Sequence, residues 1–252
     1  MKQNDTQLRQ VLVKLLNEEN FIAHISVDCT IFGYHAGHLK ILLLKYHDLD
    51  QWTLPGGLVY FHEDLREAAE RVLYERTRLQ NLFLSQFHAF GRKDRSINNP
   101  IKTLIEKRDI PVPENHWIFQ RFVTVGFCSL IDFTTAETFS NPLEESFDWF
   151  DVDELPEMSM DHERIINKGL KFLQQNLDTQ IIAYNLLPEK FTMNQLQGVY
   201  ETVLKHEFRR NNFQRKMLSL NTLERLEKYY DGSANKAPYL YRFRDDIVDF
   251  LD

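Results

Sequence analysis

Four glutamates spaced along a segment of helical pattern are the residues in this chain best suited to phosphate chemistry. Mg²⁺ is a hard cation that prefers clustered carboxylate oxygens, and neighbouring positions of one helix can supply them. A second interpretation is structural: a solvent-exposed helix face on which Glu67 and Arg71 pair at an i,i+4 spacing. Both interpretations stay open for the four side chains, which are Glu63, Glu67, Glu70 and Glu75.

The elements that must position these carboxylates follow from hydrophobic periodicity. Leu54-Pro55-Gly56-Gly57 interrupts regular structure, and Asp64 to Arg78 follows with the spacing of a helix. An apolar face at helical spacing predicts another helix over residues 7–17. Runs of β-branched and aromatic residues predict strands. These strands cover residues 22–32, 39–45, 122–133 and 147–150.

The segment from Gly57 to Leu79 resembles the Nudix box, whose glutamates hold divalent metal against a diphosphate. Gly57, Glu63, Arg71, Leu73, Glu75 and Leu79 fit its pattern. Val72 and Arg76 stand where the pattern has glutamates, and Arg78 stands where it has glycine. A guanidinium in place of a carboxylate inverts the charge of the metal shell. We therefore expect no catalytic residue, no metal ligand, no cofactor and no enzymatic activity. The alternative is an Mg²⁺-dependent pyrophosphatase acting on a nucleoside-diphosphate sugar, with metal ligands from outside the box.

A degenerate box can still belong to a binding pocket. Phe90 to Arg95 follows a predicted strand and resembles the segment that lines the ligand site in Nudix-related regulators. Arginine offers forked donors for phosphate, carboxylate or hydroxyl groups, and an aromatic ring offers a stacking face. The alternative is an exposed basic loop. Residues 98–120 look like an insertion. The sequence does not decide whether it is a lid, a dimer contact or an inert loop. The candidate ligand-binding residues are Phe90, Arg92, Asp94, Arg95, Glu75 and Arg121.

A basic segment near the C-terminus is the second feature that carries chemistry. The chain as a whole has a net charge of −7, which on average argues against a nucleic-acid partner. Residues 205–216, however, carry a local charge of +4, so the rest of the chain carries −11. A localised basic surface matters more for binding an anionic polymer than the total charge does.

The residues around this segment have the order of a winged helix. Thr192 and Gln195 fit a capping box, so a helix should begin near Met193 and precede the basic helix. A second helix after a short turn is the arrangement that enters the major groove. Residues 226–230 and 239–243 predict a hairpin, the wing. The alternative is a solvated basic helix in a purely structural subdomain. The candidate DNA-binding residues are Thr192, Gln195, Arg209, Arg210, Asn211, Asn212, Gln214, Arg215, Lys216 and Lys236.

Both motifs occur here in the order found in Nudix-related transcriptional regulators of the NrtR type, which the chain closely resembles over most of residues 22–244. The resemblance implies a homodimer that binds palindromic operator DNA and responds to a small-molecule effector, ADP-ribose or, in a sugar-utilisation branch, L-arabinose. The lost glutamates and the insertion favour the sugar branch. A protein-binding adaptor built on the same folds has no feature in its favour.

Composition limits the class of protein. Hydrophobic residues make up 43% of the 252, enough for a buried core. Cys29 and Cys128 are expected to be reduced thiols, and no apolar run is long enough to span a membrane, so we expect a cytoplasmic location. The expected fold is α+β, a Nudix-like α/β/α sandwich followed by a winged helix-turn-helix. The expected parts are an N-terminal helix (1–21), an effector domain (22–158), a bridging helix (159–175) and a DNA-binding domain (176–252).

Overall fold

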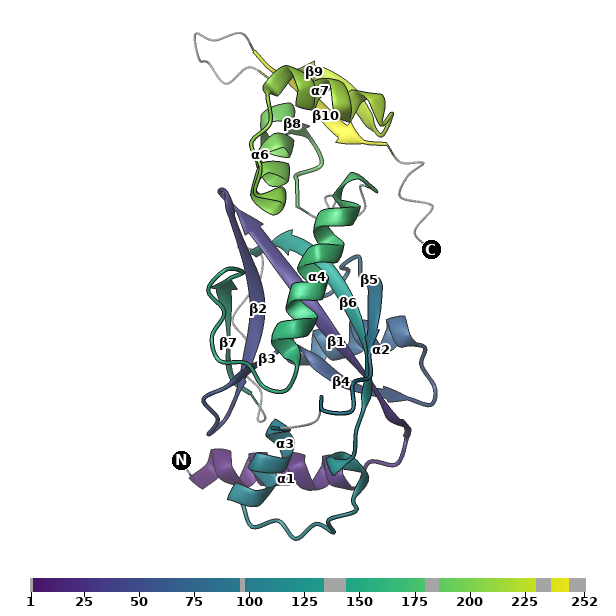
Figure 1. Ribbon diagram of the computed structural model, residues 1–252, viewed down its shortest axis with the longest axis vertical. Helices are drawn as coiled ribbons and strands as arrows, with labels where there is room; N and C mark the ends of the chain where they lie inside the picture. The colour runs from purple at the N-terminus through teal and green to yellow at the C-terminus, as the bar shows by residue number, and fades with distance from the viewer. Residues whose placement is uncertain (1, 96–97, 134–143, 180–185, 230–236, 245–252) are drawn as a thin grey trace.

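The computed structural model describes residues 2–95, 98–133, 144–179, 186–229 and 237–244 (Figure 1). Helices are labelled α, strands β and short 3₁₀ turns η. In chain order the elements are α1 (Lys2–Leu16), β1 (Phe21–His35), β2 (His38–Tyr46), β3 (Trp52–Thr53), β4 (Gly56–Tyr60), α2 (Leu65–Thr77), β5 (Ser85–Phe90), α3 (Pro100–Lys107), η1 (Trp117–Phe119), β6 (Val123–Asp132), β7 (Glu144–Asp151), α4 (His162–Asn176), η3 (Leu177–Thr179), β8 (Phe191–Thr192), α6 (Met193–Leu204), α7 (Arg210–Ser219), β9 (Leu223–Lys228) and β10 (Tyr239–Phe243).

A mixed sheet forms the centre of the first domain. Its order is β3-β2-β1-β6-β5, with β4 paired to β1 and β7 paired to β2. The long strand β1 runs parallel to β6 and antiparallel to β2. Helix α2 covers one face of the sheet, where Val72 and Leu73 pack on Val27 and Ile31. Helix α4 covers the other face, so the domain is the expected α/β/α sandwich.

Helix α2 begins and ends where its sequence signals lie. The Asp64 side chain accepts from the backbone N–H groups of Arg66 and Glu67, and the Glu67 side chain returns a bond to the Asp64 N–H. This capping box satisfies donors that the first turn leaves unpaired. Arg78 ends the helix in the left-handed region, at φ 61°. The predicted pair of Glu67 with Arg71 is wrong, because the Glu67 carboxylate instead accepts from the Asp64 N–H.

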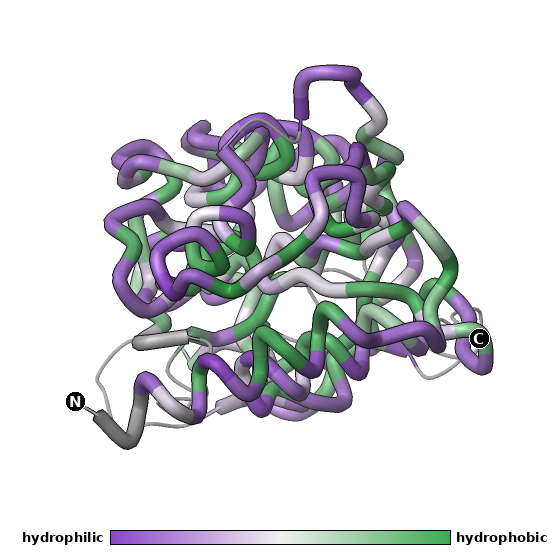
Figure 2. The backbone as a smooth tube through the Cα atoms, turned by 90° about the horizontal axis from the view of Figure 1, so that it is seen from below, coloured by the Kyte–Doolittle hydropathy of each residue, from purple (hydrophilic) through white to green (hydrophobic). Residues whose placement is uncertain are grey.

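The N-terminal helix and the segment 98–120 form a separate layer at one end of the sheet. Helix α3 begins after Asn99, whose side chain caps Ile101 N–H, and η1 follows it. Leu8 and Leu12 of α1 pack with Leu104 in a third hydrophobic cluster, and α1 shows the matching alternation of apolar and polar residues in Figure 2. We call α1, α3 and η1 the cap. The segment 98–120 is therefore structured.

Arg108, which follows α3, forms one ion pair with α1 of the cap and one with the loop after β2 of the sheet. The Arg108 guanidinium, whose side chain is 7% exposed, contacts Asp5 of α1 at 3.2 Å and pairs with Asp48 after β2. Arg9 of α1 donates to the Arg108 carbonyl at 2.7 Å. The cap is thus held to the sheet as well as packed within itself.

The C-terminal domain has the winged-helix arrangement that its pattern predicts. Helices α6 and α7 pack on a small sheet of order β8-β10-β9. The capping box of Thr192 with Gln195 is present, and α6 begins at Met193 as expected. Strand β9 begins at Leu223, three residues before the predicted start, and the tip of the wing lies outside the described residues.

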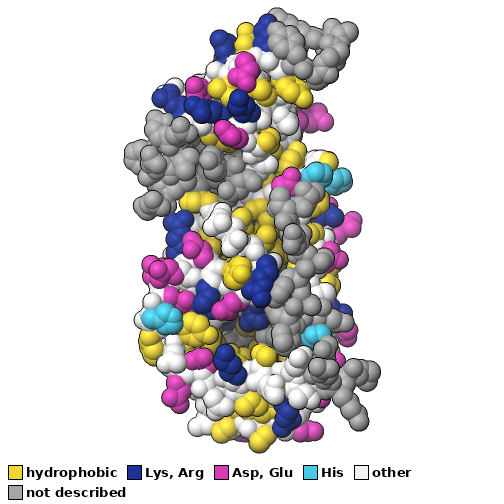
Figure 3. Space-filling model, turned by 180° about the vertical axis from the view of Figure 1, so that it is seen from behind, with side chains coloured by type: hydrophobic (Ala, Val, Ile, Leu, Met, Phe, Trp, Pro, Cys, Tyr) yellow, Lys and Arg dark blue, Asp and Glu magenta, His cyan; other side chains and the backbone are white. Residues whose placement is uncertain are grey.

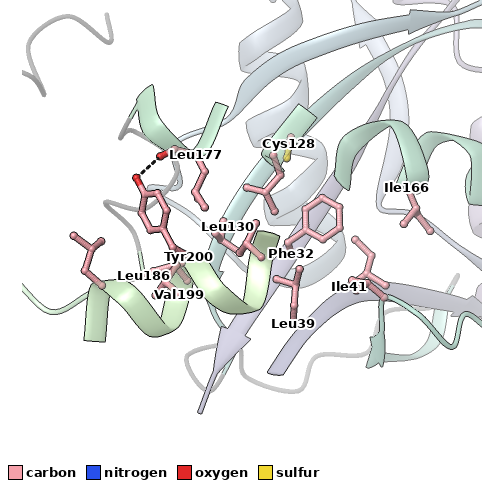
Figure 4. Close-up of a cluster of buried hydrophobic side chains, with 14 of the residues drawn as sticks. Phe32, Leu39, Ile41, Cys128, Leu130, Ile166, Leu177, Leu186, Val199 and Tyr200 are labelled. Atoms are coloured by element: carbon pink, nitrogen blue, oxygen red, sulfur yellow. Dashed lines mark hydrogen bonds between the residues drawn. The ribbon is translucent and has the colours of Figure 1, made fainter. Parts of the chain in front are cut away.

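One hydrophobic cluster joins the two domains. It contains Phe32 and Leu130 of the central sheet, Ile166 of α4, and Val199 and Tyr200 of α6 (Figure 4). Gly198 of α6 lies so close to β1 that an added Cβ would sit 3.2 Å from the Tyr34 hydroxyl. The winged helix is therefore packed directly on the sandwich. No helix within the described ranges is both long and apolar enough to cross a membrane.

Candidate functional site

The arginine and two of the glutamates of α2 and its preceding loop satisfy one another. Arg71 donates from Nη2 to Glu63 Oε1 at 2.6 Å and from Nε to Oε2 at 2.8 Å. Its Nη1 reaches Glu75 Oε2 at 3.1 Å. Burial alone would raise the pKa of the Glu63 carboxyl, but the hydrogen bonds from Arg71 and the Tyr60 N–H lower it. Glu63 is therefore a buried, ionised partner of Arg71, and the exposed-face interpretation is wrong for it.

The donor set of this helix does not fit Mg²⁺. Val72 is 1% exposed and packs so tightly that an added Cβ on Gly57 would lie 2.7 Å from it. Arg76 brings a positive charge to the same surface, and Arg71 already engages Glu63 and Glu75. In the part of the chain that the structure describes, no three acidic, histidine or cysteine residues are grouped to hold a metal ion.

A cleft of about 190 Å³ lies between the sheet, α2 and the cap. We call its polar side the floor and its apolar side the wall. The floor consists of Asp28 of β1, Arg95 and His162, with Thr53 beside them. The cap and the segment that follows it supply the wall, from Leu15, Ile101, Trp117, Ile118 and Phe122. A ligand with polar edges and an apolar face would meet both sides.

Arg95 is the buried charge at the centre of the floor. Its side chain is 2% exposed and contacts Asp28 at 3.4 Å and Asp161 at 3.2 Å. It also donates to the Phe122 carbonyl at 3.2 Å. A buried guanidinium needs such partners, because an uncompensated charge in the interior is strongly unfavourable. Three segments distant in sequence thus meet at one side chain.

His162 is held in its neutral form beside this network. Its Nδ1 accepts from the Leu54 N–H at 3.0 Å and lies 2.8 Å from the Thr53 hydroxyl. Because Nδ1 accepts a backbone N–H, the ring proton of the neutral form is on Nε2. Burial lowers the pKa of His162, and Arg95 acts in the same direction, while Asp28 and Asp161 oppose it. The floor therefore offers hydrogen-bonding groups of differing charge.

The basic helix α7 exposes most of its charge. Phe213 and Met217 are buried against α6, whereas Arg209, Arg210 and Arg215 point outward. Figure 3 shows dark blue side chains gathered over the C-terminal domain. Within the described ranges, none of these three arginines forms a salt bridge, although Arg215 donates to Asn212 at 3.4 Å. The outer face of α7 is an unneutralised basic surface.

Two side chains of α6 fix the turn that leads into α7. Gln197 donates to the Phe208 carbonyl at 2.9 Å, and Glu201 accepts from the Phe208 N–H at 2.8 Å. Hydrogen bonds from the Gln197 side chain and from that N–H lower the pKa of Glu201. This pair sets where α7 starts relative to α6, which is the geometry that a recognition helix needs.

Comparison with known families places both regions. A model of the NUDIX domain matches residues 23–169, more than half of the chain. The chain is a member of the Nudix family. A second model, of the NrtR DNA-binding winged helix domain, matches residues 183–243. The chain thus has the architecture of an NrtR-type transcriptional regulator, a Nudix domain followed by a DNA-binding winged helix.

Individual relatives match the chain over both of its domains. The ADPR responsive transcriptional repressor NtrR of Acinetobacter baylyi is 28% identical over 234 residues, which are 90% of this chain and 84% of that protein. Shewanella oneidensis NrtR, crystallised with a 27mer DNA, superposes with a TM-score of 0.65 at 21% identity, covering 89% and 95% of the two chains. A MutT/nudix family protein from Enterococcus faecalis gives 0.62 at 19%, covering 96% and 98%. The two solved structures share the fold over both domains.

The residues predicted to bind a ligand in the Nudix domain are divided by the structure. Arg95 and Glu75 line the cleft. Arg92 and Asp94 pair with each other at 2.8 Å on the surface, beside a neighbouring pocket of about 280 Å³. Phe90 is 2% exposed and packs in the core, so its expected role as a stacking face is corrected. Arg121 is exposed and is not among the residues that line the cleft. The alternative of an exposed loop fails for Arg95, which is buried.

The sequence interpretation missed several residues of the cleft. Asp28 is the one carboxylate of β1 and lies in the buried stretch of that strand, residues 27–33, which is a signal for a functional role. Trp117 lies in the segment 98–120, where no pattern indicated a contact with the pocket. His162 follows Asp161 directly, but only the fold brings either near Arg95.

The predicted DNA-binding residues fall into four groups. Arg209, Arg210, Asn211, Asn212 and Arg215 are exposed on α7, and Gln214 is partly exposed there. Thr192 and Gln195 form the capping box at the N-terminus of α6. Lys216 lies 2.7 Å from Asp178 and over the Tyr200 ring, so it faces the Nudix side of α7. Lys236 lies outside the described residues.

Proposed function

We propose that this protein is a repressor that binds operator DNA as a homodimer through α7 and the wing, and that an effector bound in the cleft changes its affinity for DNA. The observation that carries the proposal is the pairing of an unneutralised basic helix with a cleft whose metal-binding positions are occupied by Val72 and Arg76. A dimer supplies two recognition helices related by a two-fold axis, which matches palindromic operators. Its DNA target implies a cytoplasmic location.

ADP-ribose is the first effector to test. The relative from Acinetobacter baylyi is named for its response to this compound. An aromatic wall that contains Trp117 suits a nucleobase or the apolar face of a sugar ring, while Asp28 and His162 suit hydroxyl groups. L-arabinose is the competing candidate, because a polar floor with paired charges matches the hydroxyl groups of a free pentose.

Binding to genomic fragments, followed by fluorescence anisotropy over a salt series, tests the proposal. We expect tight binding to a subset of fragments, with affinity falling steeply as salt rises. Addition of ADP-ribose or L-arabinose should release the DNA, and the active compound identifies the effector. Weak binding, equal on all fragments and unaffected by either compound, would contradict the proposal. Sedimentation at the working concentration checks the homodimer.

A second candidate function is hydrolysis of a nucleoside-diphosphate sugar, which the Nudix fold itself favours. Most of the metal ligands would then come from outside the box, and Glu75, which lines the cleft and is 52% exposed despite its contact with Arg71, is the accessible box carboxylate. Mg²⁺-dependent release of a nucleoside monophosphate would support this function. The variant Glu75→Gln should then abolish turnover, and an unchanged rate would remove Glu75 from the assignment.

A further inference from the structure

Helix α4 runs along the sheet toward the winged helix (Figure 1), and residues at its start line the cleft. Met160 and His162, at its start, line the cleft. Leu177 and Asp178, just beyond its end, contact α6 and α7. The helix therefore spans the distance between the two candidate sites.

The side chains at the start of α4 bind groups at the floor of the cleft and do not cap the helix. Asp161 occupies the N-cap position but makes no capping hydrogen bond. An aspartate there ordinarily accepts from the amides of the first turn. Its carboxylate instead lies 3.2 Å from Arg95, and His162 accepts from the Leu54 N–H. The start of α4 is thus coupled to groups that a bound ligand would touch.

The middle of α4 lies unusually close to the sheet. A Cβ added to Gly169 would sit 2.7 Å from Thr30 Oγ1. This leaves no space between the helix and β1 at that point. The middle of α4 is therefore seated tightly on the sheet, between its two ends.

Three polar contacts connect the far end of α4 to the winged helix. Gln174 donates to the Val203 carbonyl of α6 at 3.0 Å, and the Tyr200 hydroxyl donates to the Leu177 carbonyl at 3.0 Å. Asp178 pairs with Lys216 of α7 at 2.7 Å. The last contact reaches the recognition helix itself, at the residue that follows the exposed Arg215.

We propose that α4 couples the cleft to the recognition helix, with Asp161 and Asp178 as the positioning residues at its two ends. This inference rests on the proposed function, since it explains how an effector in the cleft alters DNA binding. An effector that contacts Arg95 changes how firmly that arginine holds Asp161, and the first turn of α4 shifts accordingly. The Asp178–Lys216 pair then changes the position of α7. Coupling requires only that the ligand binds the two arrangements with different affinity.

Hydrogen exchange tests the coupling without any ligand. The variant Asp178→Asn perturbs the winged-helix end, and we expect amides of residues 160–166 at the cleft end to exchange about threefold or more faster. Asp161→Asn perturbs the cleft end, and we expect amides of residues 196–217 in the winged helix to exchange faster by a similar factor. Glu70→Gln, which removes a surface pair on α2, is the control and should leave both regions unchanged. Exchange confined to the neighbourhood of each substitution would overturn the inference.

A second measurement distinguishes this inference from the proposed function. The ratio of DNA dissociation constants with and without the active compound, ADP-ribose or L-arabinose, is measured for the wild type and both variants. Allosteric ratios are typically about 5- to 150-fold. We expect Asp161→Asn and Asp178→Asn to bring the ratio below about 2, while the affinity for DNA without effector and the affinity for the effector without DNA each stay within about threefold of wild type. A wild-type ratio of 1 with both compounds contradicts the proposed function, while the exchange experiment still decides the role of α4. Wild-type ratios in both variants contradict the inference alone.

Discussion

Helices α2 and α7 both carry dense charge, but they treat it in opposite ways. On α2 and its preceding loop, Arg71 is paired with Glu63 and Glu75, and Arg66 with Glu70. On α7, the outward arginines form no salt bridge within the described ranges. Charges that neutralise one another stabilise a fold, whereas charges left unpaired remain available for an external partner.

This difference separates the family motif from its chemistry. The Nudix box keeps the residues that shape its loop and helix, such as Gly57 and the Glu63–Arg71 pair, while Val72 and Arg76 replace carboxylates. The motif therefore reports the fold of the first domain. In the second domain, the pattern predicts the helix, and the arginines of that pattern are exposed.

The largest effect is expected from removal of Arg71. Arg71→Met leaves the Glu63 carboxylate, 7% exposed, without its partner and should lower the free energy of unfolding by about 3 kcal/mol. Urea unfolding measures it. The control Arg66→Met removes an exposed pair and should cost less than about 1 kcal/mol. The double variant Arg71→Met/Glu63→Gln should recover much of the loss. Equal stabilities of the two single variants would show that the α2 charges contribute no internal stabilisation.

The second prediction concerns the unpaired charge of α7. Arg210→Ala/Arg215→Ala should weaken binding to the selected operator by about 100-fold and reduce the salt slope by about 2. Arg66→Ala/Lys102→Ala removes the same charge from the first domain and serves as the control. Fluorescence anisotropy measures both. If the control weakens binding as much as the test variant, total charge and not the face of α7 determines affinity.

Local signals explain which parts of these helices the sequence predicted. Helix α2 lies within the segment from Asp64 to Arg78 that periodicity predicts, and α6 begins where the capping box of Thr192 with Gln195 indicates. Buried Phe213 and Met217 follow from helical periodicity. The α/β/α arrangement came from the resemblance, since periodicity alone does not give strand order.

The cleft depends on contacts between distant segments, and these carry no local signal. Arg95 meets Asp28 and Asp161, 67 and 66 residues away. The cap arises because apolar faces of α1 and α3, more than eighty residues apart, need each other to be buried. Lys216 was expected to face DNA, and only the fold brings Asp178 of η3 beside it.

Because the charges of the floor are paired within the protein, we expect the apolar wall of the cleft to contribute much of the binding of an effector. Trp117→Ala removes the largest ring of the wall and should weaken binding of the active effector by about 10-fold, as measured by calorimetry. Phe119→Ala lies in the same turn but does not line the cleft, so it controls for damage to the cap. Equal losses in the two variants would assign the effect to cap stability.

The smallest effect is a pH dependence of stability that belongs to the cleft and not to α7. The pKa of His162 is lowered by burial, so the unfolded chain binds a proton at a higher pH than the folded chain does. Stability from this group is complete above the ordinary histidine pKa, near 6.5, and is lost as pH falls below it, by at most about 1.4 kcal/mol per pH unit. His162→Asn keeps an acceptor for the Leu54 N–H without a titrating group. Urea unfolding at pH 7.5 and 5.5 should therefore show a smaller loss in the variant than in the wild type. The same loss in both proteins would mean that His162 is protonated as readily in the folded chain as in the unfolded chain. The floor of the cleft would then not exclude water from this ring.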